Sequence, residues 1–220
     1  MLLASVFVPT RSSQQRTSSY HSPLRARQAA ETRRTIVGAA TRLFGERGWA
    51  GTTLAAVASE AGTVVETIYA GFGSKAGLLI AAIDVAIVGD DDETPLVERA
   101  EFAALGVGSL AKRLTAAARI ITRALARAVP LMGALQEASA SDETARARLD
   151  RYEADRRATV AAGLELILGE PASEALVDSM WALASPEVFT KLTRERGWPV
   201  DRYQGWLAET AAAVLRSAGQ

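Results

Sequence analysis

The sequence has 220 residues, 49% of them hydrophobic, which is enough to form one large or two small domains. It contains no cysteine and a single histidine, His21, which excludes disulfides and thiolate metal sites and leaves almost no material for histidine-based catalysis. The charge sums to zero, but residues 1–75 hold nine Lys or Arg against four Asp or Glu, and residues 76–220 hold sixteen against twenty-one. This asymmetry is typical of a DNA-binding region joined to a part that does not bind DNA.

The first 23 residues show no hydrophobic periodicity, and we expect a disordered tail there. Its basic residues Arg11 and Arg16 either keep the tail solvated or contact DNA phosphates or the minor groove. The apolar opening lacks the basic segment of a signal peptide, so it is either an unstructured start or follows from a start codon placed too far upstream. No run of 18 apolar residues occurs, so we expect no membrane span and a cytoplasmic protein.

A helix is predicted from Pro23 to about Arg47, because apolar residues recur there at spacings of three and four. Its apolar face is formed by Ile36, Ala39, Ala40, Leu43 and Phe44. Gly48 is expected to end this helix. The next two helices must supply the surface on which this face packs.

The segment 53–72, TLAAVASEAGTVVETIYAGF, predicts two short helices joined by a turn. Thr53 is expected to cap the first helix, Gly62 to make the turn, and Thr63 to cap the second. Two short helices joined by a glycine-containing turn form the outline of a helix-turn-helix motif. We expect the second helix to pack Ile68, Tyr69 and Phe72 into the core.

Ser74 is predicted to cap a fourth helix, which ends at Gly89 before four consecutive acidic residues, Asp90–Glu93. Consecutive carboxylates point in different directions and lack the pattern of a calcium loop, so we interpret them as a solvated linker and expect no metal site.

The remaining sequence is predicted to be helical throughout, with no strand pattern. An amphipathic helix from about Leu110 is expected to stop at Pro130, and a short apolar segment follows. The further helices are predicted at 143–168, 172–184 and 200–218, with a short helix after Ser185. The fold class is therefore all-α.

Residues Thr32 to about Leu79 resemble the TetR family of bacterial transcriptional regulators. The matching features are a long helix ending Leu-Phe-x-Glu-x-Gly, a Thr-Thr pair, Ala-Gly, Thr-hydrophobic-Tyr and Phe-Gly-Ser-Lys. The resemblance implies a homodimer with an N-terminal DNA-binding domain and a C-terminal domain. With the tail at 1–23, we expect the helix-turn-helix DNA-binding domain at 24–75 and the C-terminal domain at 76–220. The C-terminal domain would both dimerise and bind a small ligand.

For the DNA-binding domain, helix N-termini and hydroxyl groups suit phosphate contacts. Lys75 would act together with the dipole of the fourth helix on one phosphate. The bidentate base readers Arg, Lys, Asn and Gln are absent from residues 63–72, so base readout is expected to be thin and DNA shape to matter more. Glu66 either accepts from a cytosine amino group or faces solvent. The predicted DNA-contacting residues are Thr53, Thr63, Val65, Glu66, Thr67, Tyr69, Ala70 and Lys75.

The C-terminal part contains no catalytic triad, no di-iron motif and no phosphate-binding glycine loop, so we expect neither an enzyme nor a cofactor. Large apolar side chains there indicate a pocket for a small apolar or aromatic ligand of unknown identity. The candidate pocket residues are Phe102, Met132, Tyr152 and Trp181. The candidate dimer contacts are Leu176, Leu183, Tyr203, Trp206 and Val214.

Together these features predict a homodimeric, ligand-responsive transcriptional repressor that binds a roughly palindromic double-stranded DNA operator and is released by its effector. Two alternatives remain open from sequence. The first is a helical ligand carrier or enzyme whose helix-turn-helix is only structural. The second is a family member that acts as an activator.

Overall fold

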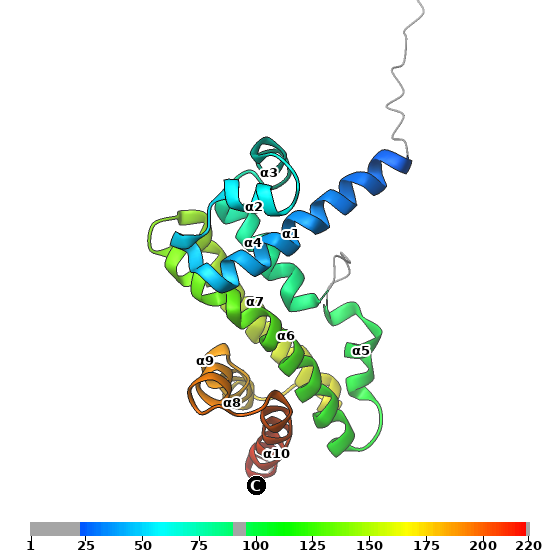
Figure 1. Cartoon of the computed structure of the whole chain (residues 1–220). Coiled ribbons are helices and arrows are strands. Elements are labelled where there is room, and N and C mark those ends of the chain that lie inside the picture. Colours follow the sequence, from blue (N-terminus) through cyan, green and yellow to red (C-terminus); the bar gives the residue numbers. More distant parts are fainter. Residues whose placement is uncertain (1–22, 90–95, 219–220) are drawn as a thin grey trace, which may run out of the picture.

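A computed structural model of the chain describes residues 23–89 and 96–218, in which helices are the only regular secondary structure (Figure 1). The predicted all-α class is therefore confirmed. Apart from Pro23, the predicted tail lies outside the described residues, and so does the acidic run Asp90–Glu93.

Three helices form an N-terminal head (residues 23–72), and a fourth leads out of it. Their bounds are α1 (Pro23–Gly51), α2 (Leu54–Glu60), α3 (Val65–Phe72) and α4 (Lys75–Val88). The predicted caps of α2 and α4 are confirmed, because Thr53 accepts a hydrogen bond from Ala56 N and Ser74 accepts one from Gly77 N. Gly62 takes the positive φ of 64° that the turn between α2 and α3 requires.

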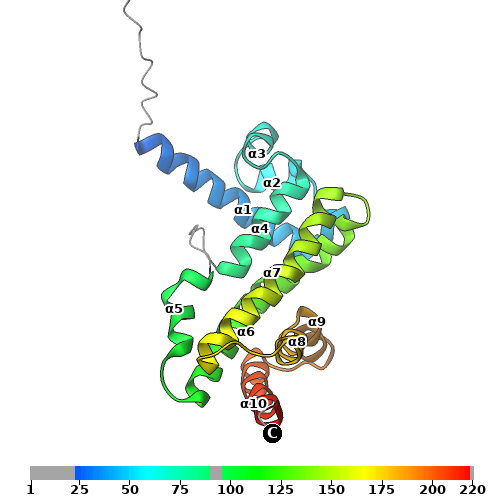
Figure 2. The same cartoon turned by 180° about the vertical axis from the view of Figure 1, so that it is seen from behind.

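The rest of the described chain forms a helical body (residues 96–218). Its elements are η1 (Leu96–Glu98), α5 (Ala100–Ala103), η2 (Ala104–Gly106), α6 (Leu110–Ser139), α7 (Glu143–Leu168), α8 (Glu174–Leu183), α9 (Pro186–Thr190), the π-helical turn η3 (Lys191–Glu195) and α10 (Val200–Ala218). The antiparallel pair α6 and α7 runs through the molecule, with α2 and α3 at one end and α8 to α10 at the other (Figures 1 and 2).

One hydrophobic core joins the head to the body. Helix α6 contacts α1, α4, α7 and α10, so it connects the two ends of the molecule. Ile36, Phe44 and Ile68 of the head belong to the same buried cluster as Leu135 of α6 and Tyr152 of α7. Because burial of apolar surface is the main stabilising term, the head packs directly on α6 rather than being tethered to the body by a linker alone.

The predicted end of a helix at Pro130 is wrong, since α6 continues through this residue to Ser139. Proline removes a helical hydrogen bond and crowds the preceding turn. Here Val129, Leu131 and Met132 around it are all buried, and Pro130 packs on Gly45 of α1. Tertiary packing therefore outweighs the local cost of the proline.

Two local predictions within the head are also wrong. Val64, not Thr63, holds the N-cap position of α3, and no side chain caps this helix. Tyr69 is 55% exposed rather than part of the core, because its position on α3 faces outward beside Ala70. Phe72 is half-buried and packs against the core as expected.

Gly48 interrupts α1 close to the predicted end of the helix, and the chain makes one more helical turn to Gly51. Its φ of 68° and ψ of −172° suit only glycine. A Cβ at this position would lie 3.1 Å from both carboxylate oxygens of Glu137 in α6. That carboxylate accepts hydrogen bonds from Trp49 N at 3.0 Å and Ala50 N at 3.4 Å, so it fixes the turn between α1 and α2 to the body.

Gly48→Ala is expected to lower the free energy of unfolding by about 1–3 kcal/mol, because alanine is strained at this φ and crowds Glu137. Denaturant unfolding of the full chain measures this change. The matched control is Gly133→Ala on the exposed side of α6, where the added Cβ meets nothing within 4 Å. The control should stabilise by about 0.5–1 kcal/mol. Equal shifts for the two variants would contradict the account.

Candidate nucleic-acid interface and ligand cavity

The outer face of α3 is free of packing and lies at one end of the molecule (Figure 1). Glu66, Tyr69 and Ala70 are exposed there, and Val64 just before the helix is 58% exposed. Only Ile68 of α3 is buried. A helix that packs on the core through one side and exposes the other has the form of a recognition helix that can enter a DNA groove.

The threonines around α3 differ in accessibility. Thr53 is exposed at the N-terminus of α2, and because its oxygen accepts from Ala56 N, its hydroxyl hydrogen stays available to a phosphate. Thr63, Val65 and Thr67 are half-buried, so each offers only part of its side chain to a ligand. The predicted contact residues are therefore brought together on one surface, with the N-terminus of α2 and the exposed side of α3 at its centre.

Lys75 is turned toward the protein in this structure. Its ammonium donates to the Trp49 carbonyl oxygen at 2.5 Å and lies 4.1 Å from the centre of the Trp49 ring. Burial lowers the pKa of Lys75, while the Glu137 carboxylate raises it. Trp49 was missing from the sequence-based site, although an aromatic residue before the Thr-Thr pair was a usable signal. A phosphate contact by Lys75 requires the side chain to leave this position.

Thr52 lies beneath Thr53 and fixes the end of α1 next to the start of α2. It is completely buried, and its hydroxyl lies 3.0 Å from the Leu43 carbonyl oxygen and 2.9 Å from that of Gly48. The hydroxyl has a single hydrogen, so it donates to one of these two carbonyl oxygens at a time, and both lie near the end of α1. The two threonines therefore have different roles: Thr52 hydrogen-bonds to the end of α1, and Thr53 caps α2.

The N-terminal part of α1 adds positive charge beside α3. This part projects beyond the head in both views (Figures 1 and 2), and Arg25, Arg27 and Arg33 on it are exposed. The Arg33 guanidinium lies 4.6 Å from the centre of the Phe72 ring at the end of α3. Arg33 therefore brings positive charge next to the end of α3.

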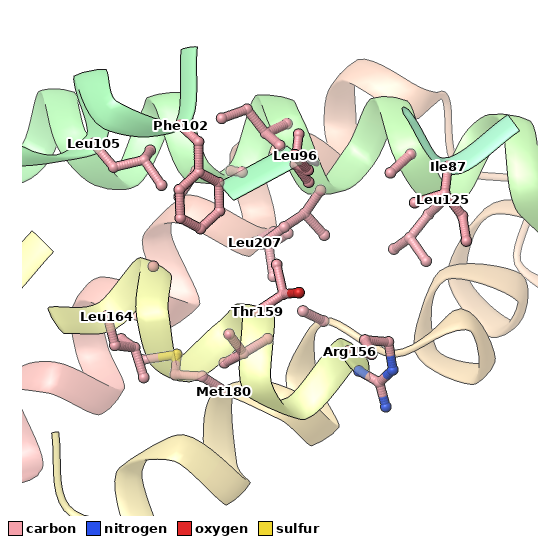
Figure 3. A pocket seen from close by; sticks show the side chains of 18 of the residues that line it. Ile87, Leu96, Phe102, Leu105, Leu125, Arg156, Thr159, Leu164, Met180 and Leu207 are labelled. Atoms are coloured by element: carbon pink, nitrogen blue, oxygen red, sulfur yellow. The ribbon is translucent and has the colours of Figure 1, made fainter. Parts of the chain in front are cut away.

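A second feature is a cavity of about 470 Å³ inside the body. It lies between α6 and α7 and is bordered by η1, α5, η2, α8 and α10, with the end of α4 at one side (Figure 3). Most lining side chains are aliphatic, including Leu125, Leu164 and Leu207. Its size and apolar lining are those of a small-molecule site.

The structure brings two of the four predicted pocket residues to the cavity. Phe102 and Tyr152 line it. Met132 instead lies in the core that joins α6 to the head. Trp181 of α8 lies under the Arg156 guanidinium at 4.6 Å, and it does not line the cavity. A large apolar side chain indicates that a residue packs inside the protein, but not that it borders the cavity.

The polar wall of the cavity was not foreseen from the sequence. Arg148 of α7 donates from Nη2 to Asp84 of α4 at 2.5 Å, and both residues line the cavity. Burial raises the pKa of Tyr152 to about 12, so its hydroxyl stays protonated at neutral pH. Asp84 and Arg148 are 64 positions apart, and no local pattern in the sequence indicates their pairing.

The predicted dimer contacts differ in their placement. Tyr203 is fully buried in its own chain against Phe189, and Leu176 is buried too, so neither side chain is available to a partner in this conformation. Leu183 is half-buried and lines the cavity. Trp206 and Val214 on α10 are half-exposed, and they share a helix face with half-exposed Thr210.

Among residues 23–89 and 96–218, no three His, Asp or Glu side chains gather as a metal site. No single described helix is long and apolar enough to cross a membrane, and only the bent pair Val65–Phe72 and Lys75–Val88 passes that test by length and composition.

The fold and both sites define a helix-turn-helix protein with a cavity-bearing helical body. Residues 36–82 match the family described as bacterial regulatory proteins, tetR family. The whole chain is similar in fold to a TetR-family transcriptional regulator from Rhodococcus sp., at 21% identity over 84% of this chain and 98% of that one, with a TM-score of 0.62. Residues 36–82 therefore form a DNA-binding domain of the tetR type, and the chain as a whole shares the fold of TetR-family structures.

Two further structures show the same fold. A TetR-family regulator from Mesorhizobium loti is 14% identical over 86% of this chain and 98% of its own, with a TM-score of 0.64. A transcriptional regulator from Saccharomonospora viridis, solved in complex with choline, is 22% identical over 82% of this chain and 95% of its own, with a TM-score of 0.55. No curated protein matches the sequence.

Proposed function

We propose that the protein is a homodimeric transcriptional repressor that binds a roughly palindromic operator through α2 and α3 and leaves it when a small molecule occupies the cavity. The observation that carries this proposal is the course of α4. Helix α4 begins at Lys75 beside α3, and its last turns supply Asp84, Ile87 and Val88 to the cavity wall. One rigid element thus borders both sites.

DNA contacts in this proposal are mostly to phosphates. Thr53 and Thr67 supply hydroxyl groups, and Tyr69 supplies a phenol from the exposed side of α3. Base contacts are limited to apolar contact of Val65 and Ala70 with thymine methyl groups and acceptance by Glu66 from cytosine. Specificity then depends strongly on DNA shape, to which exposed arginines on α1 add a screened attraction.

The proposed dimer uses the end of the body opposite the head. In α10, Trp206, Thr210 and Val214 form a half-exposed face, and α8 exposes Ala175, Ser179 and Ala182 on one side. Pairing of these faces in two copies would form an isologous interface. The two α3 helices must then lie about 34–36 Å apart to enter successive major grooves.

Release follows if the ligand shifts the population toward a different spacing of the two heads. Arg127 of α6 donates to the Ala86 carbonyl oxygen at 2.8 Å, so the end of α4 is bound to α6 as well as to α7. A ligand that separates these helices would move α4 and with it the head. The choline complex of the Saccharomonospora viridis protein supports small-molecule binding within this fold.

Lys75→Ala is expected to weaken binding to all DNA sequences alike and to reduce the salt dependence of log K by about one unit, because one phosphate contact is lost. Fluorescence anisotropy at several salt concentrations measures both quantities. Lys112→Ala, at an exposed position at the start of α6, is the control and should change neither. An unchanged salt slope for Lys75→Ala would show that its ammonium stays on Trp49.

The two alternatives make different predictions. A ligand carrier or enzyme would bind ligand but show no salt-dependent binding to duplex DNA. An activator would bind the operator, yet transcription from the promoter would fall when the protein is removed. Operator binding with increased transcription after removal is the result expected for a repressor.

A further inference from the structure

The cavity has a polar and an apolar part. Five lining residues of α7 lie on one helix face, since their spacing follows successive turns. They are Arg148, Tyr152, Asp155, Arg156 and Thr159. Beyond Thr159 the lining becomes apolar, with Leu164 on α7 across the cavity from Phe102 and Leu105 (Figure 3). Ile167 of α7 belongs to the same buried cluster as Phe102 and Leu105. A molecule that fills this space would need one polar end and an apolar remainder.

Arg148 carries the unused hydrogen-bond donor of the polar part. Its Nη2 pairs with Asp84, but its Nη1 is buried without a hydrogen-bond partner in the described part of the chain. A buried donor without an acceptor is unfavourable, and more so on a charged group. An acceptor oxygen from a ligand would remove this penalty, and a carboxylate matches the planar guanidinium best.

Arg156, the second arginine, has a hydrogen-bond partner for each of its three side-chain nitrogens. Its Nε and Nη2 donate to Glu153 Oε2 at 3.2 and 2.9 Å, and its Nη1 donates to the Trp181 carbonyl oxygen at 2.6 Å. Figure 3 shows the Arg156 guanidinium directed away from the apolar side chains of the cavity. The free donor therefore belongs to Arg148.

A cationic ligand fits this cavity less well. The carboxylates of Asp84 and Asp155 are exposed, so water already solvates them. Cation binding by aromatic rings requires an open ring face. The aromatic rings near the polar part already have an arginine of the protein beside them. The Arg148 guanidinium lies 5.9 Å from the centre of the Tyr152 ring, and the Arg156 guanidinium lies over the Trp181 ring.

We propose that the effector is an apolar molecule with a single carboxylate, and that the carboxylate accepts from Nη1 of Arg148 and shares the guanidinium charge with Asp84. This inference rests on the proposed function and names the ligand class of the same cavity. Sharing of the Arg148 charge weakens the ion pair that joins α7 to α4. Ligand binding would therefore act directly on the helix that leads to the head.

The test compares three ligands with the same apolar chain and different head groups: decanoate, decan-1-ol and decylamine. Isothermal titration calorimetry on the full chain without DNA is expected to show decanoate binding at least about tenfold more tightly than the other two, since only it gains a charge-assisted bond to Arg148. Equal affinity for decan-1-ol, tighter binding of decylamine, or no decanoate binding would overturn the proposal.

Variants separate a ligand contact from a purely structural role. Arg148→Met should remove the preference for decanoate, while Arg146→Met, at an exposed position of α7, should keep it. Asp84→Asn should increase decanoate affinity severalfold, because the guanidinium charge is then no longer shared with a second carboxylate. A decrease for Asp84→Asn would overturn this sharing even if Arg148→Met failed to fold.

The result can also be distinguished from failure of the proposed function. If decylamine or decan-1-ol binds and releases operator DNA while decanoate does not, the ligand class is wrong and the repressor proposal stands. If decanoate binds through Arg148 but the chain never binds duplex DNA, the ligand class is supported and the repressor proposal fails.

Discussion

Ala70→Glu is expected to abolish specific DNA binding without affecting the fold. Ala70 is exposed on α3, between exposed Tyr69 and Gly71, so the protein itself accommodates a larger side chain there. In the proposed complex this side faces the major groove, where a new carboxylate would meet the phosphates and carry an unfavourable charge. The affinity should fall at least about 100-fold, because like charges in an interface cost several kcal/mol.

Fluorescence anisotropy with a labelled operator duplex measures the loss, and circular dichroism confirms the helical content. Ala154→Glu, which adds the same charge at an exposed position of α7, is the control and should bind like the unmodified protein. Tight binding by Ala70→Glu would mean that α3 does not enter the DNA.

The second large effect concerns the dimer. Thr210→Arg places a long cationic side chain on the half-exposed face of α10, between Trp206 and Val214. In a symmetric interface each substitution occurs twice, and an unpaired charge is excluded from water on both sides. Light scattering should therefore give the mass of a monomer, and operator binding should weaken at least about 100-fold, because one head alone contacts half a site.

Thr210 is preferable to Trp206 for this experiment. The Trp206 ring packs on Trp198 and Tyr203 of its own chain, so its replacement would disturb the protomer as well. Ala147→Arg, at an exposed position of α7, supplies the control for an added charge and should remain dimeric. A dimer of unchanged stability for Thr210→Arg would place the interface elsewhere.

Much of the head could be predicted from the sequence, because its signals are local. The spacing of Leu43, Phe44, Val57 and Ile68 identified buried faces, and all four residues are in the core. Cap and turn chemistry at Thr53, Gly62 and Ser74 depends on neighbours within a few positions. Such signals can be recognised in the sequence because they do not depend on contacts with distant residues.

The errors arose where distant residues decide the outcome. Pro130 stays within α6 because α1 packs on it, and Gly45 and Pro130 are far apart in the sequence. Tyr203 was predicted to contact a partner through the last helix, yet Phe189 and α6 of its own chain enclose it. Hydrophobicity predicts that a side chain is buried, but not whether its own chain or a partner buries it.

The hydrogen bonds and ion pairs that join α6 and α7 to the head and to α4 could not be predicted from the sequence either. Glu137 binds the turn at Trp49, and Arg148 pairs with Asp84, in both cases across more than sixty positions. In the sequence these charged residues look like any solvated helix face. Only the packing of α6 and α7 against α1 and α4 gives them a role in joining the cavity to the head.

Selection of duplexes from a random pool by the full-length protein tests the central claim most directly. The account predicts enrichment of inverted repeats whose half-sites are centred about one helical turn, or a multiple of it, apart, and loss of this enrichment for Ala70→Glu. Enrichment of no sequence, or the same enrichment with Ala70→Glu, would contradict the assignment of α3 as the recognition helix of an operator-binding dimer.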